Sequence, residues 1–193
     1  MSALPPLNIL LEAILSAAQT PLKINDIQAL FDITEQPTSD DIREALQVLK
    51  YKLEGRGVEL IEVSSGWRIQ VPQKFSPWVS RLYDEKPQRY SRALLETLAL
   101  IAYRQPISRG DIEEIRGVFV SSNIMKTLLE RDWIKVLGQR EVPGRPNLYG
   151  TTKQFLDDFN LKQLNELPPL IELEKLEKSA EQLGLSFNTT EDE

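Results

Sequence analysis

Two stretches of the chain, LEAILSAAQTPLKINDI at Leu11–Ile27 and LETLALIAYRQPISRGDI at Leu95–Ile112, repeat one pattern and decide the fold. Each reads Leu-Glu, an apolar helix, a Gln, a Pro followed by an apolar residue, and then Asp-Ile. The spacing from the Pro to the Asp is five residues in both copies. A repeat of this length predicts that one structural unit occurs twice.

Each copy is followed by a second helical pattern and then by two strand-like runs. The apolar residues of the helical patterns are Ile42, Leu46, Leu49 and Leu53 in the first half and Ile124, Leu128 and Leu129 in the second. Thr38-Ser39 and Ser121-Ser122 precede them and suit helix N-caps. The strand-like runs are Val58–Val63, Trp67–Val71, Ile134–Leu137 and Leu148–Thr151. Between the last two runs, Pro143-Gly144 fits the middle of a type II turn.

Three short helices closed by a hairpin form the winged-helix variant of helix-turn-helix. We therefore predict an α+β, mostly helical fold of two tandem winged-helix (helix-turn-helix) domains with short β-hairpin wings. The predicted divisions are an amino-terminal domain at 1–72, a linker at 73–90, a carboxyl-terminal domain at 91–160 and an acidic, partly disordered tail at 161–193. Trp78, Val79 and Leu82 predict that part of the linker packs, and fraying is expected after about residue 186.

Composition excludes many chemistries. The 193 residues include no Cys and no His, and the net charge is −6. Thiolate nucleophiles, imidazole bases and structural zinc sites are therefore absent, and no catalytic residue, metal site or cofactor is predicted. The carboxylate pairs Glu113-Glu114 and Asp157-Asp158 point about 100° apart on a helix, so we interpret them as solvated and rank a carboxylate-dependent hydrolase last.

No apolar run reaches the ~18 residues of a membrane span, and MSALPPLNILL at the amino terminus lacks the features of a signal peptide. These features predict a cytoplasmic protein with no membrane partner.

The first helix of each half has more apolar surface than one core needs. In Leu7–Gln19 the polar residues occupy an arc of about 80°, which leaves roughly 240° apolar. In the second half Leu94, Leu98 and Ile101 form one stripe, and a second stripe adjoins it. That stripe consists of Leu95, Ala99, Ala102 and Tyr103. Its cover is either the neighbouring domain or linker, or a partner chain or second copy.

Charge argues against DNA binding by the first half. Asp40, Asp41 and Glu44 open its third helix, where helix-turn-helix proteins approach phosphates. Their favoured role is to complement the positive end of the helix dipole. The second half is more permissive, because Lys126, Arg140 and Arg145 could make weak DNA contact. The alternative for the two arginines is a solvated hairpin tip.

Several long segments resemble the segregation and condensation protein B family, the tandem winged-helix subunit of the bacterial condensin. They are LEAILSAAQTPL, GRGVELIEVSSGWRI at Gly55–Ile69, ALLETLALIAYRQPISRGDIEEIRGV at Ala93–Val118, LLERDWIKVLG at Leu128–Gly138 and VPGRPNLYGTTKQFLDDFNL at Val142–Leu161. The resemblance covers roughly residues 9–171. One departure is Asp132, which stands where the family tends to have a glycine.

The resemblance implies a non-enzymatic, cytoplasmic and nucleoid-associated adaptor. Members of the family form homodimers through the amino-terminal domain and bind the kleisin, segregation and condensation protein A. Through it they modulate the structural-maintenance-of-chromosomes ATPase in chromosome condensation and segregation, so DNA contact is expected to be indirect. The runner-up is a winged-helix DNA-binding transcriptional regulator that uses the second domain and its wing.

The resemblance also implies positions for the two protein interfaces. Carried over by position, the dimerisation candidates are Leu7, Leu10, Leu11 and Ile14. The kleisin-contact candidates are Tyr103, Ile115, Val118 and Phe119.

Overall fold

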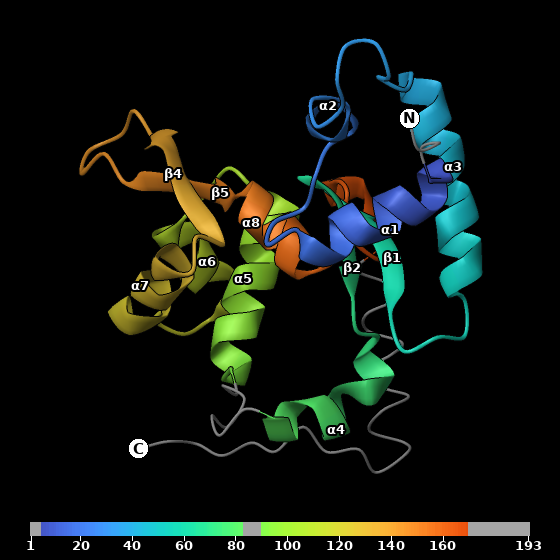
Figure 1. The fold of residues 1–193 in the computed structure, drawn as a ribbon. Coiled ribbons are helices and arrows are strands. Elements are labelled where there is room, and N and C mark those ends of the chain that lie inside the picture. Colours follow the sequence, from blue (N-terminus) through green and yellow to red (C-terminus); the bar gives the residue numbers. More distant parts are fainter. Residues whose placement is uncertain (1–4, 83–89, 170–193) are drawn as a thin grey trace. The chain divides into compact units, whose positions relative to one another are not determined.

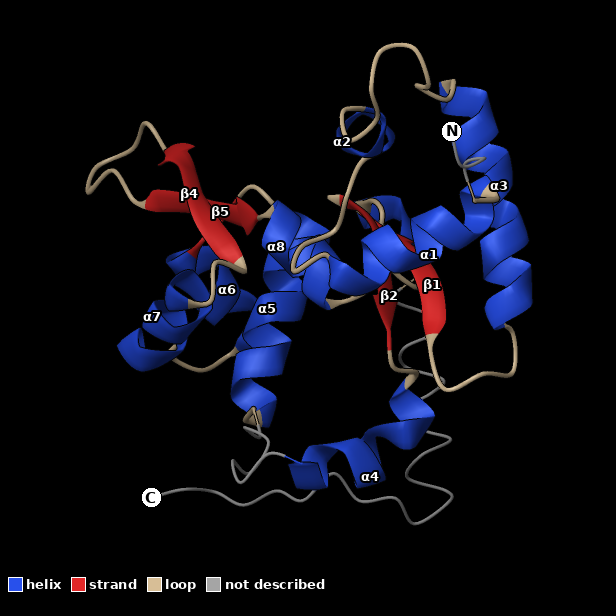
Figure 2. Cartoon of the chain, viewed as in Figure 1, coloured by secondary structure: helices blue, strands red, loops and turns tan. Residues whose placement is uncertain are grey.

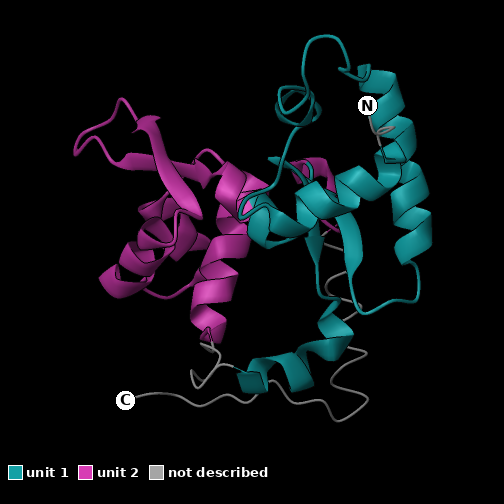
Figure 3. Ribbon diagram, viewed as in Figure 1, with its two compact units in different colours: residues 1–88, 156–162 teal, residues 89–155, 163–193 magenta. Residues whose placement is uncertain are grey.

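The computed structural model describes residues 5–82 and 90–169, and the chain divides into two compact units (Figure 3). Unit 1 comprises residues 1–88 and 156–162, and unit 2 comprises residues 89–155 and 163–193. The expected fraying after residue 186 and most of the acidic tail lie outside the described residues.

Unit 1 has three helices followed by a hairpin, in the order that the sequence predicts (Figures 1 and 2). The helices are α1 (Leu7–Ala17), α2 (Ile24–Gln28) and α3 (Ser39–Leu53), and the antiparallel strands are β1 (Glu59–Val63) and β2 (Gly66–Gln70). Val63 pairs with Gly66, so Ser64 and Ser65 form a two-residue turn. The segment that follows contains a 3-10 turn at Gln73–Phe75, α4 (Ser76–Val79) and a 3-10 turn at Ser80–Leu82.

The core of unit 1 lies between α1, α3 and the hairpin. α1 packs on α3 and β2, and Leu11 and Leu15 are the two buried residues of α1. The remaining core consists of Ile27, Ile42, Ala45, Leu46, Leu49, Leu53, Leu60 and Trp67. Full burial of one such leucine contributes about 1.5–3 kcal/mol, so this apolar face holds the short helices in place.

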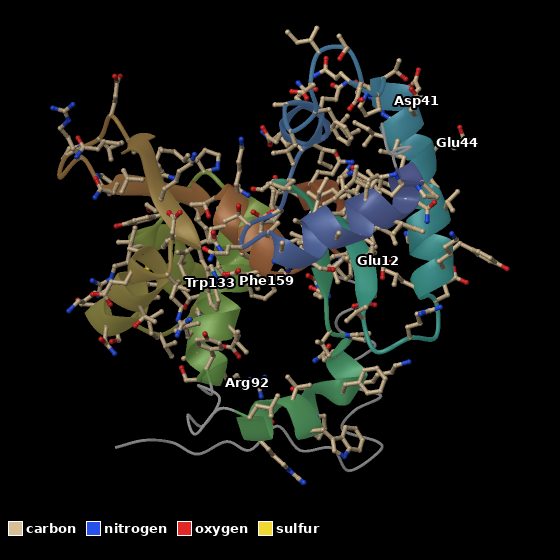
Figure 4. All side chains as sticks on the ribbon, viewed as in Figure 1. Glu12, Asp41, Glu44, Arg92, Trp133 and Phe159 are labelled. Atoms are coloured by element: carbon tan, nitrogen blue, oxygen red, sulfur yellow. The ribbon has the colours of Figure 1, made fainter. Side chains whose placement is uncertain are left out.

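The acidic start of α3 is a capping structure. The Thr38 side chain accepts a hydrogen bond from the Asp41 N–H, and the Asp41 carboxylate accepts one from the Thr38 N–H at 2.9 Å. The hydrogen bond from the Thr38 hydroxyl lowers the pKa of Asp41. Asp41 lies at the amino-terminal end of α3, with Glu44 about one turn further along (Figure 4). The predicted structural role of these acids is therefore confirmed for Asp41.

Unit 2 repeats the three helices and adds a third strand. Its elements are α5 (Arg92–Arg104), β3 (Ile107–Ser108), α6 (Arg109–Arg116), α7 (Ser122–Glu130), β4 (Ile134–Gln139) and β5 (Asn147–Thr151). The strand order is β3-β5-β4, all antiparallel. The sequence did not predict β3, because two residues are too few to produce an alternating pattern. The side chain of Gln105 ties the end of α5 to β5, since its Oε1 accepts from the Thr151 N–H at 2.8 Å.

In two turns of unit 2, the backbone conformation accounts for the residue type. The Arg145 N–H donates to the Val142 carbonyl at 2.9 Å and Gly144 has φ +85°, which confirms the type II turn. Asp132, at the position where the resemblance implies a glycine, has φ +53°. A left-handed backbone explains a preference for glycine there, and Asp is among the few other residues that tolerate it.

The last helix links the two units in sequence. α8 (Lys153–Asp158) begins in unit 2, and residues 156–162 belong to unit 1, whereas the sequence pattern predicts that the second domain extends to residue 160. Asp157 is buried, and its carboxylate accepts a hydrogen bond from the Ser65 N–H at 2.9 Å. The interpretation of Asp157 as a solvated carboxylate is therefore wrong. A 3-10 turn at Leu164–Glu166 follows.

Two residues expected to pack in the linker do not. Trp78 is 65% exposed and Leu82 is 78% exposed. α4 and the 3-10 turns on either side of it are too short to bury an apolar face, so the prediction that Trp78 and Leu82 pack is wrong.

Substitution of Gly66 tests the close approach of β2 to the backbone of Leu22 in unit 1. It has φ +136°, and an added Cβ would lie 2.3 Å from the Leu22 carbonyl oxygen, where Leu22 and Trp67 exchange two backbone hydrogen bonds. We expect Gly66→Ala to lower the stability of unit 1 by about 3 kcal/mol in thermal denaturation followed by circular dichroism.

Gly57→Ala is the matched control, because a Cβ at Gly57 would meet nothing within 4 Å. It should leave the transition nearly unchanged. Equal melting curves for the two variants would contradict the close approach at Gly66.

Candidate functional site

The outer face of α1 is an apolar surface. Ile9 is 50% exposed, Ala13 is exposed, and Leu10 and Ile14 are half-buried. We call these four residues the α1 face. The wide apolar arc predicted for this helix is therefore confirmed, since one side enters the core and the other is in part exposed.

The dimerisation candidates divide between the two sides of α1. Leu11 has no exposed surface and belongs to the core of unit 1, and Leu7 packs against that core. Leu11 therefore cannot reach a partner, and its assignment to the interface is wrong. Leu10 and Ile14 remain candidates. Sequence reasoning missed Ile9, although it lies within the same apolar arc of the helix.

A second apolar surface lies where α6 ends and the chain turns into α7. Ile115 and Val118 are each 54% exposed and Phe119 is 89% exposed. We call these three residues the α6–α7 knuckle. Three of the four kleisin-contact candidates thus occur within five residues and are all largely exposed. Burying a phenylalanine and two aliphatic side chains against a partner would remove much apolar surface from water.

The α6–α7 knuckle is held by polar contacts beneath it. Gly117 ends α6 in the left-handed conformation, with φ +71°. The Glu113 carboxylate then accepts hydrogen bonds from the Val120 N–H at 3.0 Å and from Arg109 Nε at 2.9 Å. The Val120 N–H is the main cause of the lowered pKa of Glu113. Glu113 thus anchors the loop, so the interpretation of this residue as a solvated carboxylate is wrong.

A further ion pair fixes α6 on α5. Arg116 Nη2 lies 2.9 Å from Glu96 Oε2, and the Arg116 side chain is only 11% exposed. Burial favours the neutral form of Glu96, but hydrogen bonds from Arg92 and Arg116 outweigh it and lower the pKa of this acid. The end of α6, from which the knuckle projects, is therefore held on α5 by a charged contact.

The fourth kleisin-contact candidate, Tyr103, lies on α5 and has a partner within unit 2. Its hydroxyl donates to the Pro168 carbonyl at 2.5 Å, and burial raises the pKa of Tyr103. The exposed part of the second stripe of α5 consists of Leu95 and Ala99, whereas Ala102 is buried.

The three basic candidates for DNA contact differ in their surroundings. Nη1 and Nη2 of Arg140 donate to the two oxygens of the Asp111 carboxylate, at 2.9 and 2.6 Å, so Arg140 is not simply a solvated residue of the hairpin. Lys126 lies 3.6 Å from Glu130. Arg145 is exposed in the loop between β4 and β5.

The β1–β2 hairpin of unit 1 is hydrogen-bonded to the end of α8 and to the segment after it. Arg68 on β2 donates to the Asp157 carbonyl at 2.9 Å and to Asn160 Oδ1 at 2.8 Å. The Ser64 N–H donates to the Leu161 carbonyl at 3.0 Å. A shallow hollow of about 460 Å³ beside β2 is lined in part by the same Arg68 and Asn160. Arg68 and Asn160 are hydrogen-bonded to each other within this hollow.

Within residues 5–82 and 90–169, no group of three or more acidic side chains is placed to hold a metal ion. No helix in the described part of the chain combines the length and apolar character needed to cross a membrane.

Comparison with known proteins identifies the family. Residues 9–170 match the family described as segregation and condensation complex subunit ScpB. The chain belongs to this family. It is 55% identical over 184 residues to a segregation and condensation protein B homolog of Coxiella burnetii. The matched region covers 95% of this chain and 88% of that protein.

Two solved ScpB structures are also similar to the chain. ScpB from Mycobacterium tuberculosis is 34% identical and covers 83% of this chain and 99% of that one, with a TM-score of 0.37. A dimer of an ScpB amino-terminal domain in complex with a ScpA peptide is 20% identical. It covers 44% of this chain and all of that one, also with a TM-score of 0.37. The family resemblance inferred from sequence is confirmed by the family match.

The Arg140–Asp111 pair predicts how unit 2 responds to acid. Asp111 also accepts from the Ser108 N–H, which caps α6. The hydrogen bonds from Arg140 and then from Ser108 lower the pKa of Asp111 from 3.8 to about 2. Because the folded pKa lies below the unfolded one, the stabilisation is present above about pH 4 and is lost as pH falls toward 2. Asp111→Ala should cost about 1 kcal/mol at pH 7, and the cost should shrink as pH falls from about 4 through about 2.

Arg140→Ala should shift the acid unfolding of unit 2 to higher pH, whereas Arg145→Ala, the matched control, should not. Acid titrations followed by circular dichroism measure both. Identical acid midpoints for the two arginine variants would show that the Arg140–Asp111 pair contributes nothing.

Proposed function

We propose that this chain is the adaptor subunit of a bacterial condensin. Its amino-terminal domain forms a homodimer, and its carboxyl-terminal domain binds the kleisin ScpA. Through the kleisin it modulates the structural-maintenance-of-chromosomes ATPase at the nucleoid. Family membership supports this proposal, because the family is described as a complex subunit.

The observation that carries the kleisin proposal is the α6–α7 knuckle. Phe119 is 89% exposed and lies in one exposed apolar cluster with Ile115 and Val118, and such clusters, unlike single exposed side chains, mark interaction sites. Gly117 and the Glu113–Val120 hydrogen bond hold the loop in one conformation. A preformed loop loses little conformational entropy when a partner binds, and this favours a docking role.

For the homodimer, the α1 face is the proposed interface. A two-fold dimer uses the same patch on both copies, and one exposed helix face can pack against its own symmetry mate. Ile9, Ala13, Leu10 and Ile14 provide an uncharged strip along the helix. The small Ala13 near its centre allows close approach of two helices.

Both units are proposed to be winged helices, on the basis of three helices followed by a hairpin. The DNA-binding regulator is the less supported function. In unit 1, Arg68 of the wing is hydrogen-bonded within the chain, and α3 begins with acids. In unit 2, Arg140 is paired with Asp111. A DNA-binding surface would require these charges to face phosphates.

Phe119→Asp tests the kleisin surface. Because Phe119 is 89% exposed, the change should leave the melting temperature unaltered and weaken ScpA binding at least tenfold in calorimetric titration. Ile33→Asp is the matched control, since Ile33 is 94% exposed in unit 1. Both variants binding ScpA as tightly as the wild type would refute this surface. A salt-dependent shift of duplex DNA that is lost in Arg145→Ala would favour the regulator instead.

Ile9→Asp tests the dimer surface. The variant should fold normally and run as a monomer in light scattering, because a two-fold dimer would bury an unpaired carboxylate from each copy in the apolar interface. Leu11→Asp should instead unfold unit 1, since Leu11 is completely buried. A dimeric Ile9→Asp protein would exclude the α1 face as the interface.

A further inference from the structure

The outer stripe of α5 is an apolar surface that is occupied at one end. Leu95, Ala99 and Tyr103 are four residues apart, so they lie on one side of the helix. Leu95 is 43% exposed and Ala99 is exposed, whereas Tyr103 is half-buried. The opposite side, with Leu94, Leu98 and Ile101, is buried in the core of unit 2.

At its Tyr103 end, the stripe is contacted by the chain's own segment Leu167–Pro169. The Tyr103 hydroxyl donates to the Pro168 carbonyl at 2.5 Å. Leu167 is half-buried and has φ −62° and ψ 135°, which is the polyproline II conformation, and two prolines follow. Such a segment has no internal backbone hydrogen bonds, so its carbonyls are free to accept from a surface. Proline-rich segments in this conformation are commonly bound by surfaces that carry aromatic side chains.

The contact between Tyr103 and the segment Leu167–Pro169 is weak enough for another segment to replace it. Pro168 and Pro169 remain exposed, and Leu164, which begins the preceding 3-10 turn, is 36% exposed. Of the residues in this segment, Leu167 alone contributes a half-buried apolar side chain. One neutral hydrogen bond corresponds to an equilibrium factor of about three- to tenfold, so little is lost when the segment is released.

We propose that the outer stripe of α5 docks an extended, uncharged, proline-containing segment of the kleisin, and that Leu167–Pro169 occupies this place in the free protein. The chain's own segment is thus a built-in competitor that sets the kleisin affinity. This inference rests on the proposed function. It adds a second contact beside the α6–α7 knuckle and states the chemistry that the contact selects.

Weakening the chain's own segment should strengthen kleisin binding. In the full-length protein, Leu167→Gly with Pro168→Gly disfavours the polyproline II conformation and leaves Tyr103 intact. Calorimetric titration with full-length ScpA should give an affinity three- to tenfold higher than that of the wild type. Pro77→Gly, which changes an exposed proline of α4, is the control and should bind like the wild type.

A spectroscopic measurement reports on Tyr103 itself. The chain has five tyrosines, so 3-fluorotyrosine labelling gives a fluorine spectrum in which Tyr103→Phe identifies the Tyr103 resonance. Addition of ScpA to the wild type should shift that resonance, and so should the double substitution without ScpA. An unshifted resonance in the double variant would show that the chain's own segment does not occupy the site, and would overturn the inference.

The outcomes separate the two proposals. If the wild type binds ScpA but the double variant binds with equal or lower affinity, the inference fails and the proposed function stands. If the wild type does not bind ScpA, both fail.

Discussion

The constraint on which the rest of the structure depends is that the first helix of each unit carries more apolar surface than its own small core can cover. In unit 1, α1 commits Leu11 and Leu15 to the core and leaves Ile9 half exposed. In unit 2, α5 buries Leu94 and leaves its neighbour Leu95 43% exposed. Units of this size have little stability to spare, so surplus apolar surface is costly unless it serves an interface.

Polar contacts fix where that surplus surface is presented. The carboxylates that the sequence suggested were solvated are instead structural: Glu113 binds the loop before α7, and Asp157 binds the turn of the unit 1 hairpin. Each accepts a hydrogen bond from a backbone N–H, and an unsatisfied buried donor is costly. The chain thus uses acids as loop anchors, and the apolar residues beside the Glu113 anchor are left exposed.

Much of the fold was predictable because helix and hairpin patterns are local. The repeat, the N-caps at Thr38 and Ser121 and the Pro143-Gly144 turn all depend on residues close in sequence. The errors concern contacts between distant residues. Nothing local indicates that Asp157 meets Ser65, 92 residues earlier, or that Arg140 meets Asp111. Helical periodicity likewise gave the width of the apolar arc of α1 but not its orientation, which is why Leu11 was assigned to the wrong side.

The mass of the protein in solution, alone and with ScpA, tests most directly whether the surplus apolar surface is covered by a partner. Size-exclusion chromatography with light scattering should give twice the chain mass of 22.1 kDa for the protein alone, and a heavier species that contains ScpA when the two are mixed. A 22.1 kDa monomer at high concentration that elutes separately from ScpA would contradict the account, because the surplus apolar surface would then have no partner.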